Sequence, residues 1–316
     1  MDTQITDFDS RLNKLEKAYA DNYAATGKFP VSQQVEYTPE IKSKVGEMAP
    51  FYRFLESKGC IQGTDSSYVG FYVESNTNTA AFMDELDEIP DHGPATYTEV
   101  TKKMSTVATG IEVSMMAQMG NNTLDYLSKQ IENGYVNITN ILDKTLLEGL
   151  GTTASKDFKG FANEVTTNVK DNSTNKITEN IINDMIEDIV DDNKGTPDAI
   201  ITNYTVARQL RDIIYDYYRF NDKVDVGIGF RVNTFEAENG QQLPIIIDPN
   251  MTSNQMFIVD SSTIQLKQLM APTLFTDLPT NILGYRQAIA TFITSQNIAE
   301  FQNGLIKNIG TTTPSG

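Results

Sequence analysis

Cysteine, histidine and tryptophan are almost absent from this chain. Its 316 residues include one cysteine, one histidine and no tryptophan. A single cysteine, Cys60, excludes an intramolecular disulfide framework and fits best with a reducing cytoplasm. We expect Cys60 to be a small, buried, apolar side chain. His92 is the only imidazole and lies in an acidic segment far in sequence from Cys60, so a catalytic dyad or triad built on either residue is disfavoured.

Positive charge and long apolar runs are also scarce. The 25 Lys and Arg residues face 42 Asp and Glu residues, which gives a net charge of -17 and a pI near 4.4. Such a charge repels phosphate backbones and argues against sequence-specific nucleic-acid binding as the main task. No run approaches the roughly 18 apolar residues of a membrane span, and the first 20 residues lack the apolar core of a secretory signal. We therefore expect a soluble protein made in the cytoplasm.

What the chain does contain is ordinary for a globular protein of some size. Hydrophobic residues make up 39% and charged residues 21%, and the mean hydropathy is -0.34. The length exceeds the usual single domain, so two interleaved domains are favoured over one very large one.

The first fifty residues combine two different kinds of segment. A short heptad-like patch at 12–19 is followed by a polar stretch that Pro30, Pro39 and Pro50 interrupt. The segment has too few apolar residues to pack by itself, so it is either disordered or an arm that lies on a neighbouring surface, and we favour the arm.

Two strand-like stretches, 67–73 and 96–101, flank an acidic middle at 84–92. That middle holds five carboxylates and His92, so a metal site must be considered, but it lacks the Asp-x-Asp-x-Asp-Gly order of a calcium loop. A solvated hairpin tip is the favoured interpretation. A long two-stranded projection without a core of its own is costly in isolation and would be useful if it lay across another subunit.

A long amphipathic helix is predicted next. Asn122 is a plausible N-cap, apolar residues then recur at steps of three or four, and Gly149 and Gly151 end the pattern. The helix is expected over 123–148. Its predicted apolar face consists of Leu124, Leu127, Ile131, Tyr135, Ile138, Leu142 and Leu146.

The second half of the chain predicts a unit of sheet and helices. Thr178 is a candidate cap for a helix with an apolar face from Ile181 to Ile189, and Asn203 for another that follows a buried strand at 199–201. Strands are expected at 230–235, 243–247, 256–260 and 263–266, and late β-rich stretches at 282–293 and 298–306. Asn239-Gly240 predicts a type I′ turn between the first two strands.

Two glycine-rich stretches resemble nucleotide-binding loops but lack residues that such loops require. The stretch 149–153 lacks the Gly-Lys-Ser/Thr of a phosphate loop and follows a helix where a strand should stand, so a helix end is favoured. The stretch 227–230 lacks the third glycine of a dinucleotide fingerprint and is better read as a loop or strand bend.

Two side-chain clusters have a functional and a structural interpretation. Asp188, Asp191 and Asp192 could be paired carboxylates for acid/base work, yet a solvated helix face is favoured. An aromatic and arginine cluster could stack nucleobases, yet in an acidic chain a core edge or a protein interface is favoured. That cluster consists of Arg211, Tyr215, Tyr217, Tyr218, Arg219 and Phe220. We assign no catalytic, cofactor-binding or metal-binding residue, no cofactor, and no enzymatic activity.

The order of these segments resembles the major capsid proteins of tailed bacteriophages, the Hong Kong 97-type shell fold. The resemblance runs from about Lys44 to Ile309 and rests on local matches at 106–114, 146–149, 158–163 and 197–203. It implies an α+β fold with an N-terminal arm, an extended β-hairpin loop, a peripheral domain with a long spine helix, and an axial domain. The implied parts are an arm and lead-in at 1–60, the hairpin loop at 61–108, the peripheral domain at 109–180 and 270–309 with the spine helix at 123–148, the axial domain at 181–269, and a flexible tail at 310–316.

The resemblance also implies a function and partners. The chain is expected to be a structural protein of the virion that assembles in the host cytoplasm from hexamers and pentamers into an icosahedral shell around double-stranded DNA, with a portal and a separate scaffolding protein. Some relatives cross-link subunits through Lys-Asn bonds, and Lys102 and Lys103 lie where such a lysine could be, but we assign no cross-link. The alternatives are an encapsulin-like compartment shell and, from another class, a soluble metal-dependent hydrolase.

Overall fold

The computed structural model describes residues 46–75, 82–84, 96–116, 126–217, 224–225, 231–232, 234–276, 278–279 and 283–310. The side chain of Asp192 and those of 213–233 are outside this description, as are the arm-like segment 1–45, His92, the glycine stretch 227–230, and Tyr218, Arg219 and Phe220. Contacts divide the chain into units at 1–42 and 43–316, and every described residue belongs to the second.

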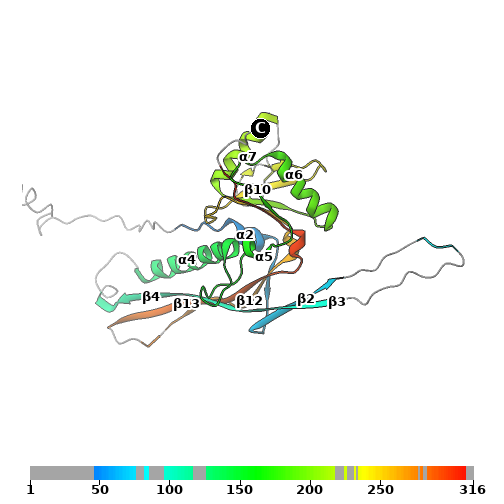
Figure 1. The fold of residues 1–316 in the computed structure, drawn as a ribbon. Coiled ribbons are helices and arrows are strands. Elements are labelled where there is room, and N and C mark those ends of the chain that lie inside the picture. Colours follow the sequence, from blue (N-terminus) through cyan, green and yellow to red (C-terminus); the bar gives the residue numbers. More distant parts are fainter. Residues whose placement is uncertain are drawn as a thin grey trace, which may run out of the picture. The chain divides into compact units, whose positions relative to one another are not determined.

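The first layer is a four-stranded sheet covered by the long helix α4 (Tyr126–Glu148). Its strand order is β1 (Ile61–Gly63), β12 (Ile264–Phe275), β13 (Gly284–Asn297) and β4 (Ser105–Ser114), with β1 parallel to β12 and the other pairs antiparallel. Figure 1 shows α4 lying along β4 and β13. A Cβ on Gly134 of α4 would come 2.8 Å from the side chain of Ile289, so this glycine lets helix and sheet approach closely.

The predicted spine helix is confirmed where the structure describes it. It ends at Glu148 as expected, and Ile138, Leu142 and Leu146 are buried, whereas its predicted first residues lie outside the described part. Tyr135 is 37% exposed, so it lies at the edge of the apolar face.

The second layer is a six-stranded sheet. Its order is β5 (Val169–Asp171), β14 (Gly304–Lys307), β11 (Met256–Val259), β6 (Ala199–Thr202), β10 (Gln242–Ile247) and β9 (Thr234–Glu236). Helix α6 (Glu179–Glu187), which continues into a π-helical turn at Asp188–Asp192, and α7 (Tyr204–Tyr217) contribute to a core on one face. The short strands β7 (Val224–Asp225) and β8 (Arg231–Val232) pair with each other.

Alternation along β6 and β11 divides the apolar residues between two cores. Ile201 and Phe257 belong to the core beneath α4, whereas Ile200 and Ile258 belong to the core with α6 and α7. Both strands are buried along their whole length, on both faces of the sheet. Their sequences are therefore nearly continuous apolar runs and do not alternate with polar residues. The predicted cap of α7 is confirmed, because the Val206 N–H donates to Asn203 Oδ1 at 3.0 Å.

Helix α2 (Pro50–Ser57) shows where the lead-in segment joins the fold. Phe51 and Leu55 are 1% and 0% exposed, and the Phe51 ring meets the ring of Phe161 edge-on at 6.2 Å between centroids. Phe161 begins the short helix α5 (Phe161–Glu164). The lead-in therefore contributes to the core from Ala49 onwards.

Two predictions of local structure are wrong. Residues 298–306 are not one β-rich stretch, because the 3-10 turn η3 (Glu300–Gln302) lets the chain leave β13 in one sheet and enter β14 in the other. Asn239-Gly240 is not a type I′ turn, since that turn needs positive φ at both residues and only Gly240, at 79°, has it. The Gly240 N–H donates to the Ala237 carbonyl at 2.8 Å, which closes a turn that needs a left-handed residue only at the glycine.

The predicted hairpin strands are confirmed. β2 (Tyr68–Ser75) and β3 (Thr96–Lys103) pair antiparallel over their whole length, from Tyr68 opposite Lys103 to Ser75 opposite Thr96, as a separate two-stranded sheet. The acidic middle lies outside the described residues except for Asp84. No helix in the described part of the chain is long and apolar enough to cross a membrane.

Candidate assembly interface

The β2–β3 pair, hereafter the ribbon, has two chemically different faces. Because directly opposed residues of antiparallel strands share a face, the register places Tyr68, Tyr72 and Tyr97 on one side. These three side chains are 58%, 67% and 62% exposed. The opposite face carries Val69, Phe71, Val73 and Val100, all partly buried. Large exposed aromatic side chains on a two-stranded projection are typical of a protein interface.

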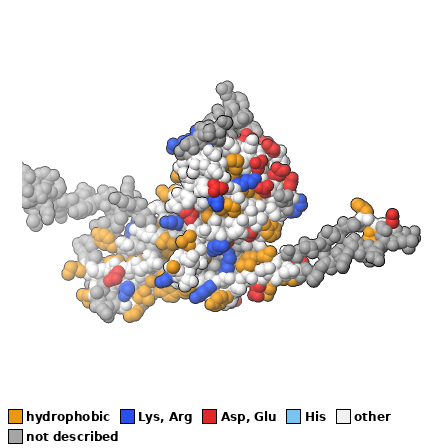
Figure 2. Space-filling model, viewed as in Figure 1, with side chains coloured by type: hydrophobic (Ala, Val, Ile, Leu, Met, Phe, Trp, Pro, Cys, Tyr) orange, Lys and Arg blue, Asp and Glu red, His pale blue; other side chains and the backbone are white. Residues whose placement is uncertain are grey.

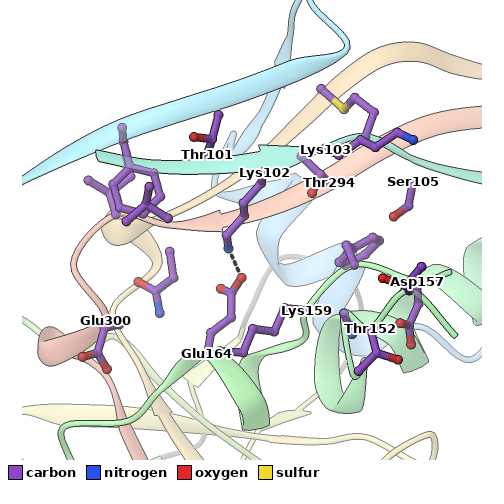
Figure 3. Close-up of a pocket in the computed structure, with 18 of the residues that line it drawn as sticks. Thr101, Lys102, Lys103, Ser105, Thr152, Asp157, Lys159, Glu164, Thr294 and Glu300 are labelled. Atoms are coloured by element: carbon purple, nitrogen blue, oxygen red, sulfur yellow. Dashed lines mark hydrogen bonds and ion pairs between the residues drawn. The ribbon is translucent and has the colours of Figure 1, made fainter. Parts of the chain in front are cut away.

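The apolar face of the ribbon forms one wall of an open groove of about 1160 Å³. The loop 151–159, which follows α4, and the end of β13 with η3 form the other walls, as Figure 3 shows. Three segments far apart in the sequence therefore meet at the base of the ribbon.

A buried ion pair fixes the ribbon to this base. Lys102 of β3 pairs with the carboxylate of Glu164 and donates to the Ser295 carbonyl oxygen at 2.9 Å (Figure 3). The side chains of Lys102 and Glu164 are 18% and 6% exposed. Burial raises the pKa of Glu164, and Lys102 and Lys159 oppose that rise without cancelling it.

The loop after α4 is built by glycines and one carboxylate. A Cβ on Gly149 would lie 2.4 Å from the Phe158 carbonyl oxygen, and Gly151 has a φ of 65°, so both positions require glycine. Asp157 accepts the backbone N–H groups of Leu150 at 3.1 Å and Gly151 at 2.9 Å. Burial acts to raise the pKa of Asp157, but these bonds and the Ser155 hydroxyl outweigh it and lower the pKa. The predicted helix end is thus confirmed for this glycine stretch.

The groove is lined by four lysines and by the carboxylates of Asp157, Glu164 and Glu300, and among the residues that the structure describes only Lys102 and Glu164 pair with each other. Lys103, Lys156 and Lys159 line it, and none of them forms an ion pair within the described residues. Figure 2 shows Lys and Arg side chains near the base of the ribbon, whereas Asp and Glu side chains gather elsewhere, over α6. Two buried polar atoms in the groove wall, Thr294 Oγ1 and Asn297 Nδ2, have no hydrogen-bond partner in the described part of the chain.

Those sequence-predicted candidates that the structure describes form no hydrogen bond or ion pair with one another. Cys60 is buried, its thiol donates to the Ser261 carbonyl oxygen at 3.3 Å, and burial raises its pKa, so the expected small buried side chain is confirmed. Asp188 forms a partly exposed ion pair with Lys170 at 2.8 Å and Asp191 is exposed, in agreement with a solvated face. Arg211 is also exposed on α7. Among the described residues, no three His, Cys, Asp or Glu side chains lie together as metal ligands.

Two fully buried carboxyl groups were not predicted from the sequence, those of Asp143 on α4 and Asp248 directly after β10. The available signal was positional, because Asp143 stands beside Leu142 on the apolar side of the spine helix, where an ionisable residue needs a specific partner.

The sequence model of the SU10 major capsid protein family matches residues 20–310. The chain belongs to this family. It is therefore a major capsid protein of a phage shell, a structural class of protein. No curated protein matches the sequence.

Solved structures show the same fold at low identity. A capsid of an empty GTA particle matches with a TM-score of 0.67 and 10% identity over 91% of this chain and 99% of that one. The capsid of cyanophage A-1(L) gives 0.67 and 9% over 89% and 99%. The SrpI encapsulin of Synechococcus elongatus PCC 7942 gives 0.64 and 9% over 90% and 95%. This mixed α+β fold is thus that of Hong Kong 97-type capsids and encapsulins.

Proposed function

We propose that this major capsid protein self-assembles, through hexamers and pentamers, into an icosahedral shell that encloses double-stranded DNA. Family membership over most of the chain supports the assembly role, and the net charge of -17 fits a wall that surrounds DNA without gripping it. Assembly would take place in the host cytoplasm, with a portal and a separate scaffolding protein as partners. We retain the proposed division into arm, hairpin loop, peripheral domain, axial domain and tail, but assign β5 and β14 to the axial domain, because they belong to the six-stranded sheet.

The ribbon and its groove are the proposed contact between copies, and the groove is the observation that carries this part. It offers apolar surface, three lysines without an ion pair in the described residues, and two buried polar atoms without partners there. The acidic run 84–91 of a neighbouring copy has the complementary charge and includes the apolar residues Leu86 and Ile89. We infer that this run, at the far end of a neighbour's hairpin loop, binds in the groove.

Charge reversal tests this contact. Lys156→Glu/Lys159→Glu should leave the subunit folded, because both side chains are exposed, while lowering shell yield and slowing assembly. Lys144→Glu/Lys176→Glu is the matched control, because both lysines are exposed, lie outside the groove and form no ion pair in the described residues. Sedimentation velocity measures shells against free subunits, and shells at wild-type yield from the double variant would remove the groove from the assembly mechanism.

An encapsulin-like compartment is the second candidate, because the SrpI encapsulin has the same fold. The two functions differ in what the shell encloses. A shell purified from infected or expressing cells should contain DNA or be empty on the first proposal and should hold a protein cargo with its own docking peptide on the second. The hydrolase alternative instead requires small particles and a metal-dependent activity.

A further inference from the structure

The segment that leads into α2 is held by polar side chains from two other elements. On α4, Asn140 Oδ1 accepts the Met48 N–H at 2.9 Å and Asn140 Nδ2 donates to the Gly46 carbonyl at 3.0 Å. In the turn after β10, Asn250 Nδ2 donates to the Met48 carbonyl. The residues immediately after the undescribed N-terminal part are therefore fastened to the spine helix and to the second sheet.

At the centre of this attachment lie the carboxyl groups of Asp143 and Asp248, both 0% exposed. The Tyr52 N–H donates to Asp143 Oδ1 at 2.8 Å, and the Phe51 N–H donates to Asp248 Oδ2 at 3.2 Å. These amides belong to the first turn of α2, where N–H groups have no partner within the helix. The two carboxyl groups thus cap α2 from outside it.

The pair is bound to itself and to Asn250, and no Lys or Arg among the described residues forms an ion pair with it. The two carboxyl groups share a hydrogen bond, Asn250 Nδ2 donates to Asp143 at 2.8 Å, and the Asn250 N–H donates to Asp248 at 2.9 Å. Burial, and next the charge of Asp248, raise the pKa of Asp143 to about 8. Burial also raises the pKa of Asp248.

The other charged groups on the surrounding elements do not neutralise the pair. Among the described residues, they are Glu47, Arg53 and Glu56 on 46–49 and α2, and Lys144 and Glu148 on the last two turns of α4. Arg53 is engaged by Glu47 and Glu56, Lys144 is exposed, and Glu148 is held by the backbone N–H groups of Thr252 and Ser253. Strands β6 and β10 bring no charged side chain.

We propose that Asp143 and Asp248 form a proton-dependent clasp. While the pair holds a proton, the clasp fastens residues 46–49 and α2 to the spine helix, and it weakens as the pH rises. Opening frees both carboxyl groups into water, where they ionise normally. Between pH of about 4 and 8 the closed form therefore holds at least one proton more than the open form, because the pKa of Asp143 is raised to about 8 and that of Asp248 is raised as well. The clasp is strongest at the acid end of this window, loses about tenfold or more in its closing equilibrium per pH unit, and changes no further above about 8.

The consequence for assembly rests on the proposed shell function. Because the clasp holds the segment through which residues 1–45 join the core, acid conditions would fix the base of the arm and alkaline conditions would free it. The opening itself does not depend on that function, so the two can fail separately.

Hydrogen exchange of the full chain, followed by mass spectrometry on unassembled subunits, tests the clasp. Protection factors of peptides that cover 46–57 should fall about tenfold or more per pH unit from pH 5 to pH 8 and then level off, at lower opening free energies than peptides of β11. The variant Asp143→Asn/Asp248→Asn has no carboxyl to titrate and should lose the pH dependence, whereas Glu300→Gln should keep it. Protection of 46–57 that is constant from pH 5 to 8 in the wild-type chain overturns the proposal, even if the double variant fails to fold. A clasp that opens while shell yield stays independent of pH would overturn only its role in assembly.

Discussion

The ion pair between Lys102 and Glu164 makes the clearest energetic prediction, because it joins the ribbon to the rest of the subunit. In Lys102→Met the carboxylate of Glu164, 6% exposed, loses its partner while staying buried. Breaking a buried pair from one side typically costs about 3–5 kcal/mol. The ribbon can also detach from its base, which lets water reach Glu164. The stability that Lys102→Met loses therefore cannot exceed the free energy needed to detach the ribbon.

A double-mutant cycle separates these effects. Lys102→Met/Glu164→Leu removes both charges and should recover most of the stability that Lys102→Met alone loses. Urea unfolding of unassembled subunits measures the free energy of unfolding, and hydrogen exchange of β2 and β3 reports detachment.

The pH dependence has a definite sign. Lys102 is the main group that lowers the pKa of Glu164, so its removal raises that pKa further. Because Glu164 in the folded variant then prefers its proton, the deficit should be small near pH 4 and grow as the pH rises. If the free energy of unfolding of Lys102→Met lies within about 1 kcal/mol of that of the wild type at pH 7, and hydrogen exchange in the ribbon is unchanged, then the ion pair does not hold the ribbon.

Four further changes have definite expected outcomes. Leu142→Asp buries an unpaired charge at a 1% exposed position and should cost several kcal/mol, seen as loss of soluble subunits. Gly149→Ala places a Cβ 2.4 Å from a carbonyl oxygen and should lower the melting temperature, whereas Gly63→Ala, with nothing within 4 Å, should not. Deleting residues 1–44 should keep a cooperative melting transition but leave monomers or small oligomers in sedimentation, and an unfolded product would instead assign the arm to the core. Cys60→Ala should leave assembly yield unchanged, and a folded variant without shells would reveal a missed site.

The sequence predicted the elements whose patterns are local. The spine helix, the buried strand β6 and the cap at Asn203 follow from apolar periodicity and from one side-chain acceptor, and these do not depend on distant residues. The strands of the ribbon were predicted in the same way, because both are rich in β-branched and aromatic residues.

What the sequence did not predict depends on contacts between distant segments. The turn at Glu300 is stabilised by Thr166 and Thr167, more than 130 residues away, so a β-rich composition alone could not reveal it. The hydrogen bonds at the base of the ribbon join Lys102, Glu164 and Ser295 from three separate segments. Asp143 and Asp248 meet only because α4 packs beside the end of β10, and no local pattern brings them together.

We propose that copies of this chain close into a shell in which the acidic run 84–91 of one subunit binds in the groove of the next. Electron cryo-microscopy of the expressed full chain tests it most directly. Closed icosahedral particles of hexamers and pentamers are predicted, with density for the acidic run 84–91 of one subunit beside Lys156 and Lys159 of its neighbour. Subunits that remain monomeric under all assembly conditions, or shells whose grooves are empty, would contradict it.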